Sequence, residues 1–426
     1  MSVKVIDIPY NDGSLPLHVD EKNLKAVIVP SKPVASAKSE EELVLEALAN
    51  PIGTPRLKDL AAGKKNILLI TSDHTRAMPS KITLPLLLKE IRSGAPDANV
   101  EIILATGLHR ATTKQEQYAM FGADIVDNET IHVHDCTKDE DMREICTLPS
   151  TAKLIVNKLA VECDLLVAEG FIEPHFFAGF SGGRKSVLPG LASFKTVNTN
   201  HSYQALAGPN SVAGMLDGNP VHIDAVAACR AVNLAFILNV AMDTDKKIIA
   251  AFAGDVEEAH IKGCDYVSSF SRLPAVEGDI IVTSNGGYPL DQNLYQAPKG
   301  ASTAALCAGE NGVIIMVGAF TDGFGGDNFQ ELILSGTVDE IDEKLSKIPP
   351  EETISEQWSA QIFSKIMKKH TIIAVTTGID PELIKKANFT YAATPDEALE
   401  IAYSIKGRDA KVVIIPDGVA AMIEKA

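Results

Sequence analysis

Cysteine and aromatic residues are scarce in this sequence. Aromatic residues make up 5% of the 426 residues, with a single tryptophan. The six cysteines are scattered, and no two of them form a CxxC pair: Cys136, Cys146, Cys163, Cys229, Cys264 and Cys307. This spacing argues against a cysteine-based zinc or iron–sulfur site and indicates a reduced compartment.

Long apolar runs and an excess of basic residues are also missing. No apolar run approaches the ~18–20 residues of a membrane helix, and the N-terminus lacks the pattern of a signal peptide. We therefore expect a cytoplasmic protein without a membrane partner. The net charge is -17 and the isoelectric point about 5.1, which argues against nucleic acid as a partner. Local Arg and Lys side chains can still bind a small anion.

Strands and helices alternate through most of the chain, which is long enough for two domains. Apolar runs at 66–70, 100–105 and 165–168 each end in small polar residues and precede a helical pattern. Such runs are typical of buried parallel strands, whose carboxyl ends collect ligands. A hairpin is expected over residues 3–19, since Asn11-Asp12-Gly13-Ser14 suits a tight turn.

A second series of strands begins near residue 279, with further strands at 312–317, 371–376 and 411–415. Helical patterns lie between them at 289–308, 327–347, 352–369 and 394–406. The sequence therefore predicts an α/β fold: two α/β domains with mainly parallel sheets flanking a cleft. We expect an N-terminal catalytic and cofactor-binding domain at 1–270 and a C-terminal domain at 271–426. A last helix at 419–426 either stays there or packs back on the first domain.

Three predicted strands of the first sheet end in candidate site residues. Asp73 and Arg76 follow the first strand, where an Arg can fork onto a carboxylate or phosphate. His109 follows the second strand and His175 the third, and histidine suits acid–base chemistry near neutral pH. Two histidines at one crevice suit a reaction with one base on each face. The alternatives are a helix cap with an ion pair, a loop-bonding His109, and a His175 packed among aromatic rings.

Ser181-Gly182-Gly183-Arg184-Lys185-Ser186 resembles a P-loop superficially but lacks its GxxxxGK[ST] spacing, which disfavours a nucleoside triphosphatase. Backbone N–H groups and the N-terminus of a following helix can hold one phosphate here. Lys185 can neutralise that phosphate or act as a nucleophile. Arg184 either adds a phosphate contact or points to solvent. The alternative for the whole turn is a glycine-rich loop with solvated basic side chains.

Other candidates lie farther along the chain. His201 is a possible lone metal ligand, although by itself the signal is weak. Tyr295, Gln296 and Lys299 follow a strand of the second sheet, and Lys299 can hold a carboxylate from the far side of the cleft. The alternative for Lys299 is a surface lysine on a helix turn.

Taken in order, these motifs resemble one family, the nickel-dependent lactate racemases and related 2-hydroxyacid racemases and epimerases. The resemblance spans nearly the whole chain. It rests on Asp73-His74-Thr75-Arg76, Gly107-Leu108-His109-Arg110, the stretch from Pro174 to Ser186, His201, and Tyr295-Gln296-Ala297-Pro298-Lys299. The stretch from Pro174 to Ser186 is the most specific part.

The resemblance implies a cofactor and a role for each site residue. The family's cofactor is a nickel-pincer nucleotide, the nickel complex of pyridinium-3,5-bisthiocarboxylic acid mononucleotide, which other proteins make and which Lys185 would hold through a thioamide. His201 would complete the nickel coordination, and His109 and His175 would be the acid–base pair. Asp73, Arg76, Tyr295, Gln296 and Lys299 would bind the substrate carboxylate or lie near it. From physical reasoning we assign the nucleotide phosphate to Ser181, Gly182, Gly183 and Ser186.

The implied reaction moves the hydrogen on carbon 2 of a 2-hydroxycarboxylate as a hydride while a histidine takes the hydroxyl proton. Side chains expected to set substrate size are Met120, Phe121, Phe176, Phe177 and Trp358. One alternative is a nickel-independent enzyme that binds a nucleotide or sugar phosphate in the Ser181–Ser186 turn. Another is a two-domain binding protein without catalysis.

Overall fold

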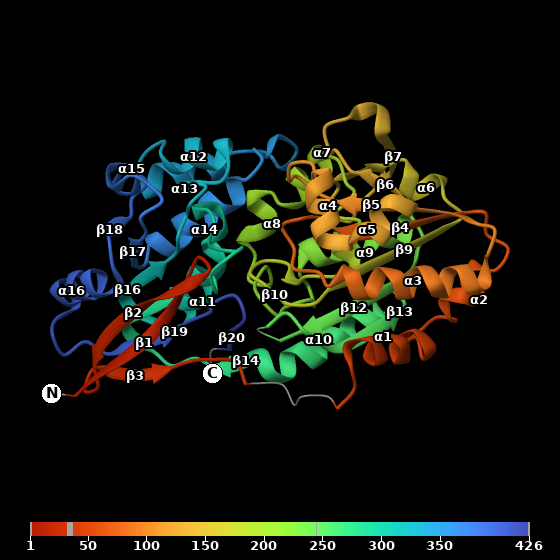
Figure 1. The fold of residues 1–426 in the computed structure, drawn as a ribbon. Helices are drawn as coiled ribbons and strands as arrows, with labels where there is room; N and C mark the ends of the chain where they lie inside the picture. The colour runs from red at the N-terminus through yellow and green to blue at the C-terminus, as the bar shows by residue number, and fades with distance from the viewer. Residues whose placement is uncertain (1, 32–36, 244, 425–426) are drawn as a thin grey trace.

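Two lobes, each built on a six-stranded sheet, make up the molecule (Figure 1). The computed structural model describes residues 2–31, 37–243 and 245–424. The predicted α/β class with two mainly parallel sheets is confirmed. In the part of the chain so described, no helix is long and apolar enough to cross a membrane.

The first sheet is parallel except at one edge, where β13 runs antiparallel to β12. Its strands lie in the order β13 (Ile248–Gly254), β12 (Leu234–Met242), β9 (Leu165–Phe171), β4 (Asn66–Ser72), β5 (Asn99–Ala105) and β6 (Thr130–Val133). The three strands that carry the candidate residues, β9, β4 and β5, are therefore neighbours. Their carboxyl ends meet at one edge of the sheet, as the sequence predicted.

Alternation of side chains along β4 divides the first lobe into two cores. Ile67 and Leu69 pack on one face, and Leu68 and Ile70 on the other, because successive strand residues point to opposite faces. The first face is covered by α1 (Glu40–Ala49), α2 (Leu57–Ala61), α3 (Ser80–Gly94), α4 (Lys114–Phe121) and α5 (Ala123–Asn128). The second is covered by the β7 (Met142–Thr147) and β8 (Lys153–Asn157) ribbon, α6 (Leu159–Glu162), α7 (Phe194–Asn200), α9 (Pro220–Ala231) and α10 (Glu258–Ser271).

The second sheet is parallel throughout and includes a strand from the N-terminus. Its order is β18 (Thr390–Ala392), β17 (Thr371–Val375), β16 (Ala308–Val317), β15 (Gly278–Ser284), β19 (Val412–Ile415) and β3 (Leu24–Val27). One face packs against α11 (Pro298–Cys307), α12 (Asp327–Ile333), α13 (Val338–Ser346), α14 (Gln357–Met367) and α15 (Pro381–Lys386). The other packs against α16 (Pro395–Lys406).

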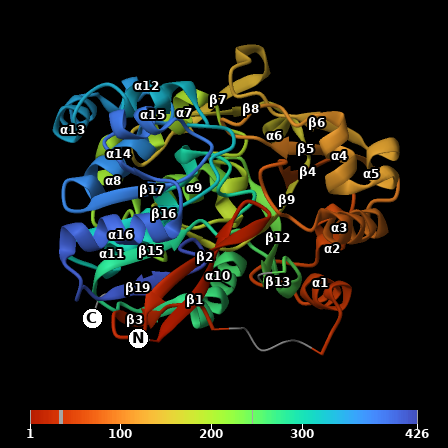
Figure 2. The same cartoon turned by 60° about the vertical axis from the view of Figure 1, so that its left-hand side comes forward.

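The first residues of the chain belong to the second lobe. The predicted hairpin forms from β1 (Val3–Tyr10) and β2 (Gly13–Asp20), and it lies over the second sheet in both views (Figures 1 and 2). Ile8 and Leu17 are fully buried against Ile280 and Val282 of β15. The expected domain at 1–270 therefore misassigns residues 3–27, because strand pairing and this apolar contact attach them to the other sheet.

The end of the chain also differs from expectation. In place of a helix at 419–426, β20 (Met422–Glu424) pairs in parallel with β14 (Arg272–Pro274), and residues 425–426 lie outside the described part. Met422 packs against Ile172 and Phe180 of the first lobe, so the segment does return to that lobe, but as a strand. The expected helix at 289–308 is shorter, since α11 begins only at Pro298.

Candidate active site

His109 and Asp73 lie side by side after neighbouring strands. Asp73 follows β4 and His109 follows β5, and His109 Nδ1 lies 2.6 Å from Asp73 Oδ2. Thr75 donates its N–H and its hydroxyl to the other carboxylate oxygen. Burial opposes ionisation of Asp73, but the hydrogen bond and charge of His109, together with Arg76, hold the pKa of Asp73 well below its usual range. The carboxylate therefore fixes a proton on Nδ1 and leaves Nε2 for proton transfer.

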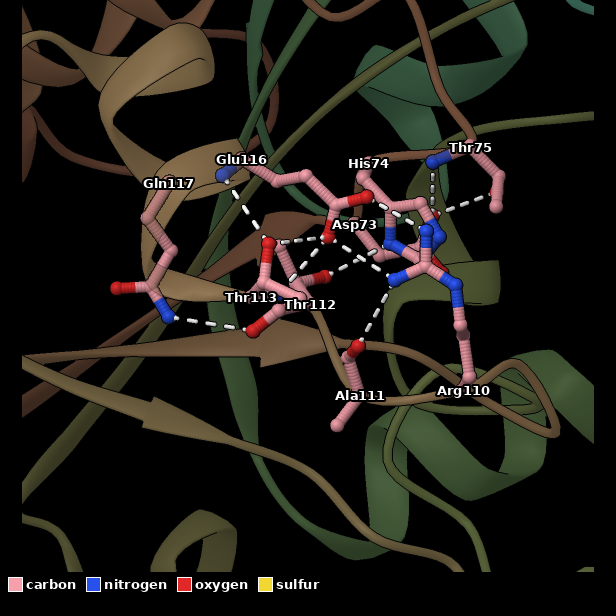
Figure 3. Close-up of polar contacts among 9 residues, drawn as sticks. All are labelled: Asp73, His74, Thr75, Arg110, Ala111, Thr112, Thr113, Glu116 and Gln117. Carbon is pink, nitrogen blue, oxygen red and sulfur yellow. Dashed lines mark hydrogen bonds and ion pairs between the residues drawn. The ribbon is translucent and has the colours of Figure 1, made fainter.

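The two loops are also joined outside this pair. His74 Nδ1 lies 3.0 Å from the Thr112 hydroxyl, and Arg110 forks onto Glu116 at the start of α4 (Figure 3). Thr113 caps the same helix through a reciprocal pair of bonds with Glu116. The His74–Thr112 contact holds the loop that carries His109 against the loop that carries Asp73, and the Glu116 contacts fix the His109 loop to the start of α4.

His175 occupies a different environment. It lies in the two-residue strand β10 (Pro174–His175), paired with β11 (Gly179–Phe180), and its Nδ1 accepts the N–H of Ala178 at 3.2 Å. Its ring centroid lies 4.6 Å from that of Phe177. Burial, followed by the charges of Lys185 and Lys299, holds the pKa of His175 well below its usual range. His175 is therefore uncharged near neutral pH.

Lys185 lies in the short 3-10 turn Gly183–Ser186 and shares this environment. Its Nζ lies 5.9 Å from the centre of the Phe177 ring. Burial and the charge of Arg184 hold the pKa of the Lys185 amine well below its usual range, and Arg76 adds to the effect. A lower pKa raises the fraction of uncharged amine, which is the nucleophilic form of lysine.

His201 lies at the end of α7 and joins the same aromatic cluster. Its ring contacts Phe177 at 5.0 Å and Trp358 at 5.1 Å between centroids. The side chain is 5% exposed, and within the described part of the chain its Nδ1 has no hydrogen-bond partner. Burial lowers the pKa of His201 to about 3. An uncharged imidazole is the form that binds metal ions.

The second lobe supplies the opposite wall of the site. Trp358, on α14, donates its indole N–H to the Tyr295 hydroxyl at 2.7 Å. Lys299, on the first turn of α11, borders a narrow pocket with His175. Burial and the charge of Arg76 lower the pKa of Lys299 to about 8. Gln296 precedes α11, in the 3-10 turn Leu294–Gln296.

Several polar groups of the glycine-rich turn already form hydrogen bonds within the protein. Ser181 donates its hydroxyl to the Phe171 carbonyl and accepts the N–H of Glu173. Gly183 donates its N–H to Asn239 at 2.7 Å. Gly183 has a φ of 52°, and a side chain on it would meet His260 at 2.7 Å. Close packing and left-handed backbone explain this glycine without a phosphate.

Arg184 corrects an expectation, because it neither reaches a phosphate nor points to solvent. Its side chain is buried beneath the turn at 1% exposure. The helix expected directly after the turn is also missing, since α7 begins only at Phe194. The N-terminus of α7 therefore does not directly follow this turn.

Sequence reasoning missed Glu173, and it placed in the site two side chains, expected to set substrate size, that lie elsewhere. Glu173 borders the same pocket as His175 and Lys299, and its negative charge acts on Lys185 and Lys299. Its position directly before Pro174-His175 was the available signal. Met120 and Phe121, expected to set substrate size, pack instead in the core beneath α4.

Arg76 thus acts on both the carboxylate that backs His109 and the buried His175, and Lys185 and Lys299 act on His175 as well. Such a set of groups is typical of an enzyme that binds a small anion and moves protons. In the residues described, no group of three or more His, Cys, Asp and Glu side chains is arranged to hold a metal ion.

Comparisons with known proteins identify the family. Residues 10–214 match the model of the lactate racemase N-terminal domain, and residues 273–423 match that of the lactate racemase C-terminal domain. The chain is 48% identical to the lactate racemase of Thermoanaerobacterium thermosaccharolyticum over 99% of both chains. It is 48% identical to that of Lactiplantibacillus plantarum over 98% of this chain and 99% of the relative.

Solved structures agree. The lactate racemase apoprotein from T. thermosaccharolyticum superimposes with a TM-score of 0.95, covering 99% of this chain and 100% of that one at 48% identity. A Thermotoga maritima protein at 19% identity shares the fold, with a TM-score of 0.69 over 94% of this chain and 100% of that chain. The chain belongs to the lactate racemase family and is an enzyme of the racemase class.

Proposed function

We propose that this enzyme interconverts the two configurations of lactate or a closely related 2-hydroxyacid. The observation that carries this proposal is that the charge of Arg76 acts both on Asp73, which backs His109, and on His175, on which Lys299 acts as well. Two proton-transfer groups serve two enantiomers, and the cations bind the carboxylate that such substrates share. Relatives with 48% identity over the full chain are lactate racemases.

Each histidine has one ring nitrogen committed to the protein. Asp73 occupies Nδ1 of His109 and the Ala178 N–H occupies Nδ1 of His175. The Nε2 of His109 is therefore free to accept the substrate hydroxyl proton, whereas the Nε2 of neutral His175 carries the ring proton and can donate it. Arg76 and Lys299 hold the carboxylate while carbon 2 changes configuration, and Tyr295 and Gln296 complete that wall. Lobe closure would exclude water from the reacting carbon.

The chemistry of the site fits the nickel-pincer nucleotide that the family resemblance implies. Burial and neighbouring charge lower the pKa of the Lys185 amine, which favours the uncharged, nucleophilic form that a thioamide bond to the cofactor requires. His201 has a buried Nδ1 without a partner among the described residues and an uncharged ring, as a nickel ligand requires. When bound, the cofactor supplies a hydride acceptor and donor for carbon 2.

For the nucleotide phosphate, the glycine-rich turn offers only part of the predicted set of groups. Because Ser181 and Gly183 bond within the protein, Gly182 and the Ser186 hydroxyl are the better candidates in the turn, with Arg76 or Lys299 supplying charge. Loading requires partner proteins that make the cofactor.

The test is to produce the protein together with the cofactor-making proteins. Matured protein should contain nickel, gain mass on Lys185 and interconvert D- and L-2-hydroxyacids, read by chiral chromatography across a panel of acids. Lys185→Ala should abolish the mass gain and the racemisation. Lys195→Ala, at an exposed lysine near Phe194, is the matched control and should behave as wild type.

Two results would contradict the proposal. Racemisation by Lys185→Ala protein would exclude the covalent tether. Binding of a nucleotide or sugar phosphate by unmodified, metal-free protein, with no racemisation of any hydroxyacid, would favour the nickel-independent alternative.

A further inference from the structure

Arg184 is a fully buried cation whose guanidinium binds the backbone of the segment leading to Lys185. Its Nη2 donates to the Ala178 carbonyl at 2.6 Å, and its Nη1 to the Gly182 carbonyl at 3.2 Å. The Ser181 carbonyl lies 3.4 Å from the same Nη1. One side chain therefore holds three carbonyl oxygens of a five-residue stretch.

No acidic partner compensates this charge. In the described part of the chain, no carboxylate lies within ion-pair distance of the guanidinium. Its surroundings are His260 and two buried thiols, Cys229 and Cys264. Burying an arginine without a counter-ion costs free energy that its hydrogen bonds must offset. A side chain that served only to fill this space would be apolar.

The backbone of the turn connects Arg184 to Lys185 directly. The Gly182 carbonyl that accepts from Arg184 also accepts the N–H of Lys185, at 3.1 Å. The Lys185 carbonyl accepts the N–H of Gly190, and the Gly190 carbonyl accepts the N–H of Gly107. Gly107 opens the loop that carries His109. Bonds made by Arg184 thus fix the Lys185 backbone, which in turn borders the His109 loop.

We propose that Arg184 is a positioning residue that holds the Ala178–Ser186 turn from beneath, so that the Lys185 amine is presented in the cleft. This inference rests on the proposed role of Lys185 as the cofactor tether. It assigns to Arg184 a function through the backbone, with no contact to substrate or cofactor.

Hydrogen exchange of the cofactor-free protein tests the positioning. Arg184→Met removes every donor at similar length, Arg184→Lys keeps the charge with a different donor geometry, and Arg230→Met is the matched control on the half-exposed face of α9. Peptides covering 178–188 should exchange about tenfold faster or more in Arg184→Met, since a charge-assisted bond is lost. In the same peptides, the exchange rate of Arg184→Lys should be intermediate, and that of Arg230→Met should match wild type.

Attachment gives the second measurement. After production with the cofactor-making proteins, the fraction of folded Arg184→Met carrying the added mass on Lys185 should fall about tenfold or more, with partial recovery in Arg184→Lys. Unchanged exchange of 178–188 in Arg184→Met would overturn the inference. So would faster exchange spread evenly over β4 and β5, because that indicates a general loss of stability.

The same measurements separate this inference from the proposed function. If Arg184→Met does not fold, Arg184→Lys carries the test, and exchange equal to wild type over 178–188 with full attachment would overturn the inference. A different outcome is that wild-type protein gains no mass on Lys185 while hydrogen exchange over 178–188 still rises in Arg184→Met. That result would contradict the covalent tether but support the positioning of the turn by Arg184.

Discussion

The two candidate acid–base histidines occupy opposite environments. His109 is backed by the Asp73 carboxylate, and its side chain is 32% exposed. His175 has a backbone N–H in place of a carboxylate, and Lys185, Lys299 and Arg76 act on it with positive charge. One environment supports a ring that takes up a proton, and the other opposes it.

This difference shows what an anion adds to the site. Without a ligand, the cations around His175 repel its protonated form. A bound carboxylate or phosphate neutralises those cations and removes the repulsion. We therefore expect proton transfer at His175 to depend on occupation of the site by an anion, whereas His109 has its own carboxylate at all times.

Removing either histidine should have the largest effect. His109→Ala and His175→Ala should each lower kcat of the matured enzyme by about 10²–10⁴-fold, because each removes one acid–base group. Initial rates from each enantiomer, measured by chiral chromatography, check this. His132→Ala, at an edge strand and paired with Glu101, is the control. A loss of kcat below tenfold at either site would contradict the assignment of the two histidines as an acid–base pair.

Removing the carboxylate behind His109 tests the asymmetry itself. Asp73→Asn should lower kcat by about 10²-fold or more, since a carboxylate that fixes the histidine tautomer is lost. Asp135→Asn is the matched control, because Asp135 bonds to Thr137 as Asp73 bonds to Thr75 but, among the described residues, has no hydrogen bond to a histidine. Equal effects of the two substitutions on kcat would indicate that Asp73 only stabilises the structure of its loop.

The cation cluster should give the enzyme a pH limit. Lys299 has a pKa of about 8 in the free protein, so it is charged below pH 8 and loses its charge above it. We expect kcat/KM to fall by up to about tenfold per pH unit above 8. Lys299→Arg should remove this fall, because arginine stays charged. A wild-type profile that is flat from pH 7 to 10 would contradict the assignment.

The smallest effect is expected at the aromatic wall. Trp358→Phe keeps an aromatic ring beside His201 but removes the hydrogen bond to Tyr295, which corresponds to about 0.5–1.5 kcal/mol, or a few-fold in KM. Steady-state kinetics of the matured enzyme check this. Tyr295→Phe should give a change of similar size if the bond itself matters, whereas a much larger change would indicate direct contact of the hydroxyl with substrate.

Much of the site was predictable from sequence because it lies at strand ends. Once 66–70, 100–105 and 165–168 are predicted as parallel strands, Asp73, His109 and His175 must approach one edge. Local composition alone indicated the aromatic contacts among His175, Phe177 and His201. Residue spacing does not give the geometry of the rings.

Other features depended on long-range contacts. Assignment of β3 to the second sheet needs pairing with β19, almost 390 residues away, which local patterns do not encode. The burial of Arg184 could not be predicted either, since an arginine in a glycine-rich turn normally indicates a solvent-exposed side chain or an anion-binding site. Its buried position depends on carbonyl oxygens that only the folded turn brings together.

The sequence by itself determined the α/β class, the strand ends that carry the reactive residues and the family resemblance, because apolar periodicity and motif order are local properties of the chain. Only the tertiary structure decided that Asp73 supports His109, that the pKa values of Lys185 and His175 lie well below their usual ranges, and that β3 completes the second sheet. Those features depend on burial and on distances between charges, which arise only when separate segments pack together.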